Sequence, residues 1–304
     1  MSTYSRVLTV ALLALSLLGP MPAAAKTLRL AMDAEPVSMD PHAHLSTGTL
    51  QFSHLVFDPL LRWTQAMDIE PRLAHKWERI DARTLRFHLR KGVIFHSGNP
   101  LTAKDVEWTL QRLKRSESFK GVFEPVAGTK IIDDHTIDLI TKIPYPLLLN
   151  IATYIFPMDR LFYSGVDDLG KPKDAIEKFE PSFARDNASG TGPYTVTERV
   201  PGTRIIFERF ASYWDTQSPG NVSRIELSAI GDASDRVNAL LAGKMDMIMP
   251  VAPQDYDQVR LVDGVRLVTT ATPRIILLQL NQDRRPEFRD VLVRQAIVHA
   301  INNR

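Results

Sequence analysis

The sequence predicts a mixed α/β protein whose sheets contain antiparallel strand pairs. In residues 84–90, Leu85, Phe87 and Leu89 alternate with polar side chains, which is the pattern of a strand with one buried face. Residues 102–113 instead place apolar side chains at helical spacing. Strand-like and helix-like segments follow one another without a regular strand–helix–strand rhythm, so a purely parallel sheet is not expected.

The first residues predict export. Arg6 precedes an apolar run over residues 7–18, and the small residues 23–25 follow it. These are the parts of a cleavable secretory signal peptide, and the apolar run is shorter than the roughly 20 residues that span a bilayer. We therefore expect residues 1–25 to be removed and the mature protein to be soluble and periplasmic.

The composition excludes several classes of protein. The 304-residue chain has no cysteine, which excludes disulfides, thiolate nucleophiles and cysteine-based zinc sites. A lipidated N-terminal cysteine is excluded for the same reason, so we do not expect a lipoprotein. The 37 Lys and Arg residues nearly balance the 35 Asp and Glu residues, which leaves no basic field for nucleic acid.

The first part of the mature chain predicts a strand, a helix, a turn and a capped helix. Residues 26–32 alternate enough for a first strand, and residues 49–61 carry apolar side chains at helical spacing. A turn is expected at residues 95–100 because of its Gly and Pro. Thr102 and Asp105 then form a capping-box-like pair at the start of the next helix.

The second part predicts mostly strands. Residues 131–140 are expected to form a hairpin, in which Asp133 and Asp134 fit a turn better than a catalytic carboxylate pair. One short helix ends at Gly243 and another covers residues 290–301. The other expected strands are residues 194–199, 203–209, 223–230, 245–249 and 274–280. The strand at 245–249 is expected to be buried.

Several clusters of residues stand in a characteristic order along the mature chain. The strongest is residues 85–110, which read LRFHLRKGVIFHSGNPLTAKDVEWTL. The others are PVSMDP at 36–41, GTGPY at 190–194, DASDRVNALLAGKMD at 232–246 and FRDVLVRQAI at 288–297. Together they resemble the family 5 extracellular solute-binding proteins, which include the oligopeptide-, dipeptide- and nickel-binding components of ABC transporters.

The resemblance implies a periplasmic binding protein-like fold of the peptide-binding type, built from two lobes. It assigns residues 26–270 to the first lobe, with an inserted subdomain at about 62–185. Residues 271–304 would then form a hinge crossing and the start of the second lobe. Because family members continue well beyond this point, we expect a C-terminal truncation with the second lobe largely missing. Without the second lobe, the chain after about Thr270 should expose apolar surface, and we expect this part to fray or the protein to aggregate.

The resemblance also implies a role in uptake. Such a protein closes its lobes over a ligand by a hinge motion and delivers the ligand to an inner-membrane ABC permease. We expect a dipeptide or oligopeptide ligand, a monomeric protein, no cofactor and no catalysis. A nickel chelate or haem bound on the same fold stays open as an alternative, and so does a non-functional fragment.

Only first-lobe residues can be assigned to the ligand by this resemblance. The first candidates lie in a loop similar to the family's cleft-facing loop: Leu45, Ser46, Thr47 and Gly48. Arg274, in the expected crossing strand, is the other candidate. Each of these residues could equally serve packing or lie on the surface.

Metal and enzyme interpretations have weaker support. His42, His44 and His54 could ligate nickel or zinc, but no carboxylate stands at a recognisable spacing and no H-E-x-x-H motif occurs. The chain has no G-x-S-x-G elbow, so a secreted hydrolase would lack a recognisable nucleophile. Tyr213 and Trp214 fit core packing better than a ligand-stacking platform.

Overall fold

The computed structural model describes four stretches of the 304-residue chain. They are residues 26–177, 179–217, 220–270 and 277–301. The chain divides into two compact units, Met1–Val262 and Asp263–Arg304. The expected signal peptide at residues 1–25 lies outside the described stretches. Within those stretches, no helix has the length and apolar character needed to cross a membrane.

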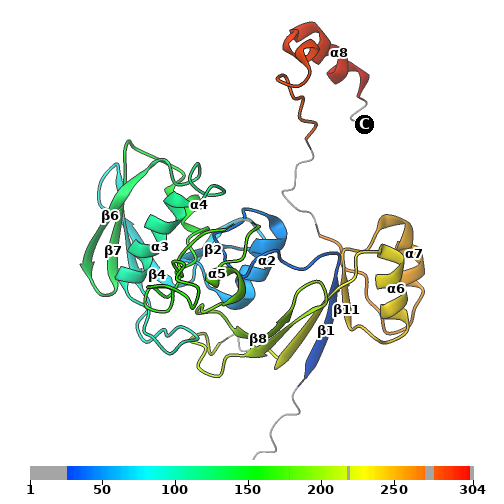
Figure 1. Ribbon diagram of the computed structural model, residues 1–304, viewed down its shortest axis with the longest axis horizontal. Helices are drawn as coiled ribbons and strands as arrows, with labels where there is room; N and C mark the ends of the chain where they lie inside the picture. The colour runs from blue at the N-terminus through cyan, green and yellow to red at the C-terminus, as the bar shows by residue number, and fades with distance from the viewer. Residues whose placement is uncertain (1–25, 178, 218–219, 271–276, 302–304) are drawn as a thin grey trace, which may run out of the picture. The chain divides into compact units, whose positions relative to one another are not determined.

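A five-stranded mixed sheet forms one part of the first unit (Figure 1). Its strands are β1 (Thr27–Met32), β8 (Tyr194–Val200), β9 (Arg204–Arg209), β10 (Arg224–Ala229) and β11 (Met247–Met249). The order is β11-β1-β10-β9-β8, in which β1 pairs in parallel with both neighbours and the remaining pairs are antiparallel. The expected mixed class and the expected strands over β1, β8, β9 and β10 are therefore confirmed.

Helix α2 (Thr47–Val56) shares an apolar core with the five-stranded sheet. It ends five residues before the expected end at residue 61, so that part of the prediction is wrong. The cause is local: Asp58 precedes Pro59, and the residue before a proline is pushed out of the helical conformation. The chain is already extended at Phe57, with a φ of −125°.

A four-stranded antiparallel sheet forms a second part of the same unit, with a core of its own. Its strands, in the order β4-β5-β7-β6, are β4 (Ala74–Arg79), β5 (Thr84–Leu89), β7 (Thr136–Thr141) and β6 (Val126–Asp133). The inward side chains Leu85, Phe87 and Leu89 are buried, which confirms the alternation expected for β5. The expected hairpin is also confirmed, because β6 and β7 pair in antiparallel fashion. In its turn, the Asp133 carboxylate accepts the backbone N–H of His135.

Helix α3 (Ala103–Arg115) packs against the four-stranded sheet through Val106, Leu110 and Leu113. At its start, the carboxylate of Asp105 accepts hydrogen bonds from the Thr102 backbone N–H at 2.9 Å and from the Thr102 hydroxyl at 2.7 Å. The expected cap is therefore present. The four-stranded sheet and α3 fall inside the expected subdomain at about 62–185, whose exact limits stay a prediction.

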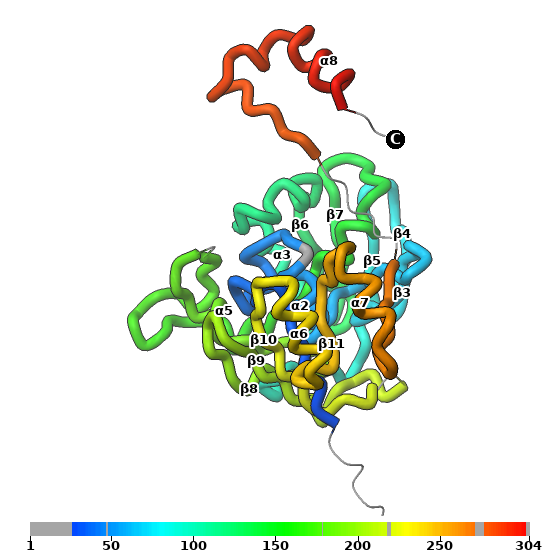
Figure 2. Tube along the Cα trace, turned by 90° about the vertical axis from the view of Figure 1, so that its right-hand side faces the viewer, coloured from blue at the N-terminus to red at the C-terminus, as the bar shows by residue number. Residues whose placement is uncertain are grey.

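Shorter elements complete the first unit. They are β2 (Leu61–Trp63), β3 (Ile69–Pro71), α4 (Leu148–Ala152), α5 (Phe183–Asp186), α6 (Ala233–Leu241), η1 (Pro253–Asp255) and α7 (Tyr256–Arg260). Figure 2 shows α6 and α7 beside β11 at one end of the five-stranded sheet. The strand expected at 245–249 is present as β11. Because it lies at the edge of the sheet, it buries Ile248 but leaves Met247 46% exposed, so the expected burial is wrong for Met247.

The second unit contains η2 (Pro286–Arg289) and α8 (Val291–Ala300). The helix expected at residues 290–301 is therefore confirmed. The strand expected at residues 274–280 is not confirmed, because its described part, residues 277–280, has no regular structure. Arg274 lies outside the described residues, so its expected role at a crossing strand stays a prediction.

Candidate ligand-binding surface of the first unit

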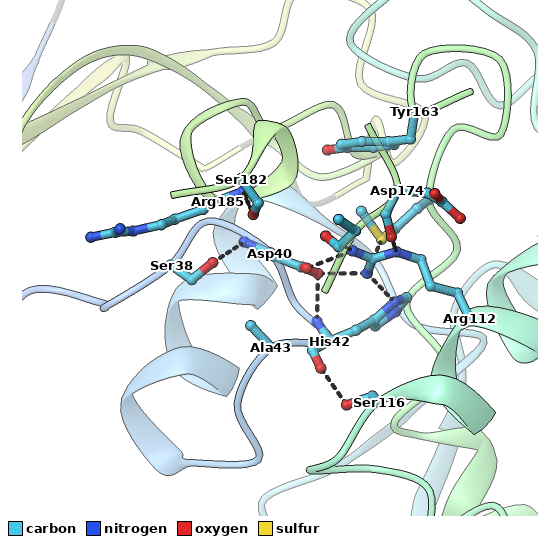
Figure 3. Close-up of polar contacts among 12 residues, drawn as sticks. Ser38, Asp40, His42, Ala43, Arg112, Ser116, Tyr163, Asp174, Ser182 and Arg185 are labelled. Carbon is cyan, nitrogen blue, oxygen red and sulfur yellow. Dashed lines mark hydrogen bonds and ion pairs between the residues drawn. The ribbon is translucent and has the colours of Figure 1, made fainter. Parts of the chain in front are cut away.

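A buried ion pair holds the loop that leads to α2 (Figure 3). The Asp40 carboxylate accepts hydrogen bonds from both terminal nitrogens of Arg112, at 2.8 Å for Oδ1 and 2.6 Å for Oδ2. The side chains are 1% and 0% exposed, respectively. Because Arg112 belongs to α3, the pair ties the loop of the five-stranded half to the helix of the four-stranded half.

Every nitrogen of the Arg112 guanidinium has a partner. Nε donates to the carbonyl of Asp174 at 3.0 Å, and Nη2 also donates to the carbonyl of Ala175 at 3.2 Å. Such full satisfaction is what makes a buried charge tolerable. Burial alone would raise the pKa of Asp40, but the charge and hydrogen bonds of Arg112 hold that pKa below its usual value. Asp40 is therefore a fixed anion inside the protein.

His42 is part of this buried cluster and is uncharged at neutral pH. Burial, and then the charge of Arg112, lower the pKa of His42 to about 3. Its Nε2 donates to the carbonyl of Phe156 at 3.3 Å, and its Nδ1 accepts from Arg112 at 3.0 Å. Both ring nitrogens are engaged, so His42 is not poised to bind a metal. Within the described stretches, no three His, Cys, Asp or Glu residues gather as a metal site.

The end of α3 also holds the backbone of the loop. The hydroxyl of Ser116 donates to the carbonyl of His42 at 2.7 Å, and the hydroxyl of Ser118 donates to the carbonyl of Ala43 at 3.0 Å. These bonds fix the chain immediately before the candidate ligand residues. A loop that is anchored in this way can present its following residues in one conformation.

The four loop candidates form the N-terminus of α2. Leu45 is 41% exposed, and Gly48 is exposed with open space where a Cβ would stand. Ser46 caps the helix: its Oγ accepts the N–H of Thr49 at 3.4 Å and donates to the Thr49 hydroxyl at 3.0 Å. Thr47 is the first helical residue. The structure brings these residues together through sequence adjacency, and their contact with ligand stays a prediction.

The other end of α2 is braced by the glycines of the GTGPY segment. A Cβ added to Gly190 would meet the carbonyl oxygen of Val56 at 2.0 Å, and one added to Gly192 would meet the carbonyl carbon of Val56 at 2.5 Å. The N–H of Gly192 donates to that same carbonyl at 2.9 Å. Only glycine permits this close approach, so α2 is held firmly at both ends.

A pocket of about 350 Å³ opens beside α2, and the sequence did not predict it. Its lining comes from α2, from β2 and from the segment after α4: Leu50, His54, Arg62, Trp63, Thr153, Tyr154 and Phe156. These segments are up to 106 positions apart, from Leu50 to Phe156, so no local pattern could have found the pocket. The available signal was the i, i+4 spacing of Leu50 and His54, which places both on one side of α2.

The pocket walls are apolar or compensated in charge. Burial, and then the charges of Arg62 and Arg72, lower the pKa of His54 to about 4, so His54 is neutral at pH 7. The Nε of Arg62 donates to the carboxylate of Glu70 at 2.6 Å. Aromatic walls without an unpaired charge suit an uncharged group of a small ligand.

Comparison with known proteins gives one family. The model for "Bacterial extracellular solute-binding proteins, family 5 Middle" matches residues 68–304. The chain is 26% identical to the dipeptide-binding protein of Escherichia coli (strain K12), covering 91% of this chain and 54% of that protein. It is 27% identical to the E. coli (strain K12) periplasmic oligopeptide-binding protein OppA, covering 87% and 50%. Heme-binding protein A of Haemophilus influenzae is 26% identical, covering 83% and 48%.

Solved structures confirm the expected periplasmic binding protein-like fold. The periplasmic binding protein DppA from Helicobacter pylori, in complex with the peptide STSA, has a TM-score of 0.69 at 23% identity over 79% of this chain and 49% of that chain. NikZ from Campylobacter jejuni, in complex with Ni(L-His), has a TM-score of 0.66 at 22% identity over 80% and 46%. The chain thus spans about half the length of the relatives it matches.

Proposed function

Because this chain belongs to the bacterial extracellular solute-binding proteins of family 5, we propose that it captures peptides with the α2 surface of its first unit. The observation that carries the proposal is the pocket of about 350 Å³ beside the rigidly held N-terminus of α2. Curated relatives are dipeptide- and oligopeptide-binding proteins, which supports the same class of ligand.

In this proposal, the chain's own residues contribute binding rather than catalysis. The buried pair of Asp40 and Arg112 holds the loop in place before ligand arrives, which lowers the entropy lost on binding. Leu50, Tyr154 and Phe156 offer apolar contact to a peptide side chain. The exposed backbone around Gly48 is available to a peptide main chain, whose recognition does not depend on side-chain identity.

The wider role follows from family membership and remains part of the proposal. The protein would act as a monomer in the periplasm. The name of one relative, the periplasmic oligopeptide-binding protein OppA, supports this location. It would bring its peptide to an inner-membrane ABC permease. A haem-binding relative and a nickel-bound neighbour keep those ligands as competitors, although the buried, fully bonded His42 does not favour metal.

Native mass spectrometry of the exported chain tests the ligand class. The protein is incubated in turn with a tripeptide mixture, with Ni(L-His) and with haem. Peptide adducts are expected, and a Leu50→Trp variant should weaken them about tenfold because indole fills the pocket. The control is Leu169→Trp, at an exposed loop position away from the pocket. Adducts of Ni(L-His) or haem without peptide would overturn the proposed ligand.

A further inference from the structure

A second cavity, away from the α2 pocket, lies at the end of β5. Its volume is about 280 Å³, and its lining residues are His75, Arg90, Lys91, Val93 and Trp214. A neighbouring hollow of about 450 Å³ shares His75 and Lys91 with it. The residues that line the α2 pocket are all different. Nothing in the proposed peptide capture uses this cavity.

Arg90 is held in one orientation at the cavity. Its Nε donates to the carbonyl of Arg72 at 2.6 Å, and its guanidinium lies 4.7 Å from the ring centre of Trp214. Trp214 is fixed in turn, because its Nε1 donates to Asp58 at 2.8 Å and its ring packs on the core of the four-stranded sheet. The packing role expected for Trp214 is therefore confirmed, and the same packing preorganises Arg90.

The charge of Arg90 is not neutralised by a carboxylate. Among the described residues, Arg90 makes no ion pair. Arg72, whose guanidinium also lies over the Trp214 ring, pairs instead with both Asp58 and Asp215. The terminal nitrogens of Arg90 thus remain available as donors. A planar guanidinium whose two terminal nitrogens are both available can donate two hydrogen bonds to a tetrahedral or planar oxyanion.

His75 reaches the cavity because β4 carries a bulge. Ala74 pairs with Leu89 and Lys76 pairs with His88, so His75 is the extra residue that has no partner in the ladder. A bulge bends its strand and re-aims the side chain at that position. The His75 ring lies 6.3 Å from the His88 ring, centre to centre, and both line the adjoining hollow.

Lys91 is placed by a tight turn. It follows Arg90 directly and precedes Gly92, whose φ of 75° is a conformation that glycine adopts without strain. In the described part of the chain, Lys91 makes no ion pair either. Two acidic residues, Asp133 and Asp134, line the adjoining hollow, and the carboxylate of Asp133 already accepts the N–H of His135 at 2.7 Å.

We propose that this cavity is a binding site for a phosphate group, with Arg90, Lys91 and His75 as its donors. Two cationic side chains and one protonatable ring match the double negative charge of phosphate better than the single charge of a carboxylate. Burial, followed by the charges of Arg90, His88 and Lys76, lowers the pKa of His75, so a bound dianion would raise it. Such binding is independent of peptide capture.

Nuclear magnetic resonance of the histidine ring protons tests the site on the whole chain. Inorganic phosphate is titrated at constant ionic strength, and acetate is titrated in parallel. A saturable shift of the His75 signal with phosphate, and a raised His75 pKa, are expected. Saturation at equal or lower concentrations of acetate would overturn the preference for phosphate, and a linear drift with both anions would overturn the site.

Variants separate the site from general charge effects. Lys91→Gln and Arg90→Gln should each weaken phosphate binding about tenfold, which is the effect of losing one charged hydrogen-bond donor. Lys76→Gln is the control, because Lys76 adjoins His75 in sequence but lines neither cavity. Equal losses in Lys76→Gln and Lys91→Gln would contradict the proposal. Lys91 is exposed, so its variant is informative even if Arg90→Gln fails to fold.

A final arm identifies the source of the phosphate group. The chain is sedimented with vesicles that contain phosphatidylglycerol and with neutral vesicles. Sedimentation that Lys91→Gln abolishes would assign the site to a lipid headgroup. Saturable binding of inorganic phosphate without sedimentation would assign it to a free phosphate compound. Failure of both assays would overturn the site while leaving peptide capture untouched.

Discussion

Helices α3 and α8 carry similar local signals but bury very different surfaces. Each helix has a hydrogen-bonded cap at its start. In α3, the Asp105 carboxylate accepts the N–H of Thr102, and in α8, the Asp290 carboxylate accepts the N–H of Leu292 at 2.8 Å. α3 buries seven residues and α8 buries none, and Leu292 is 68% exposed. Helix formation is thus encoded locally in both, whereas burial in α3 depends on the sheet and loops that surround it.

The contrast can be measured in one signal. All four tryptophans, Trp63, Trp77, Trp108 and Trp214, lie in the first unit. Their fluorescence during urea unfolding therefore reports the unit that contains α3, because the unit that contains α8 has no tryptophan. Matched substitutions in the two helices can then be compared directly.

The largest expected effect comes from breaking the buried ion pair of α3. Arg112→Met should lower the free energy of unfolding of the first unit by about 3–5 kcal/mol, because Asp40 would keep a buried charge without its partner. Urea unfolding followed by tryptophan fluorescence measures the change. Arg294→Met in α8 should leave this signal unchanged, because in the described part of the chain the Arg294 guanidinium bonds to the carbonyls of Phe288 and Arg289 within its own segment. A loss below 1 kcal/mol in Arg112→Met would mean that the pair does not hold the loop.

Core truncation is the next largest effect. Leu110→Ala should cost about 2–5 kcal/mol because it leaves a cavity beneath α3. Leu292→Ala in α8 should change the same unfolding curve by less than about 0.5 kcal/mol, as expected for an exposed position. Similar losses in the two variants would remove the distinction between the helices.

Acid should destabilise the first unit through its buried histidines. The pKa of His42 is lowered to about 3, and those of His54 and His96 to about 4, chiefly by burial. As pH falls below 6.5, the unfolded chain therefore takes up protons that the folded chain refuses, and stability falls. Each histidine contributes a loss of about 2 kcal/mol between pH 7 and pH 5. Burial raises the pKa of Asp105, which offsets part of this loss.

Urea unfolding at pH 7, 6 and 5 measures this dependence. A His96→Gln variant should show a shallower fall in the free energy of unfolding than the wild-type chain. Stability that stays constant from pH 7 to pH 5 in the wild-type chain would contradict the burial of these rings.

The smallest expected effect concerns the cap of α2. Ser46→Ala should reduce the stability of the first unit by about 1 kcal/mol, because the N–H of Thr49 loses its acceptor. Asp290→Ala removes the equivalent cap of α8 and should not alter the tryptophan signal. An unchanged curve for Ser46→Ala would show that α2 is held by its other contacts alone.

Local patterns predicted much of the fold. The alternation of Leu85, Phe87 and Leu89, the Thr102–Asp105 cap and the apolar spacing over 290–301 were sufficient for β5, α3 and α8. Long-range contacts were not predictable in this way. Asp40 and Arg112 lie 72 positions apart, and neither is apolar, so hydrophobic periodicity gave no sign that they would pair.

The candidate site was predicted only in part. The resemblance pointed to Leu45 and Ser46, which the structure places at the start of α2. The adjoining pocket depends on β2 and on Tyr154, which reach α2 only through the tertiary fold. The edge position of β11 was missed for a related reason, because an apolar run does not reveal whether a neighbouring strand will cover it.

The most direct test is hydrogen exchange by mass spectrometry, with and without a saturating peptide. In the free chain, α3 should be strongly protected and residues 290–301 should exchange rapidly. Bound peptide should slow exchange across residues 45–56 and leave residues 290–301 unchanged. Unaltered exchange at residues 45–56 with peptide bound would contradict the assignment of peptide capture to the α2 surface.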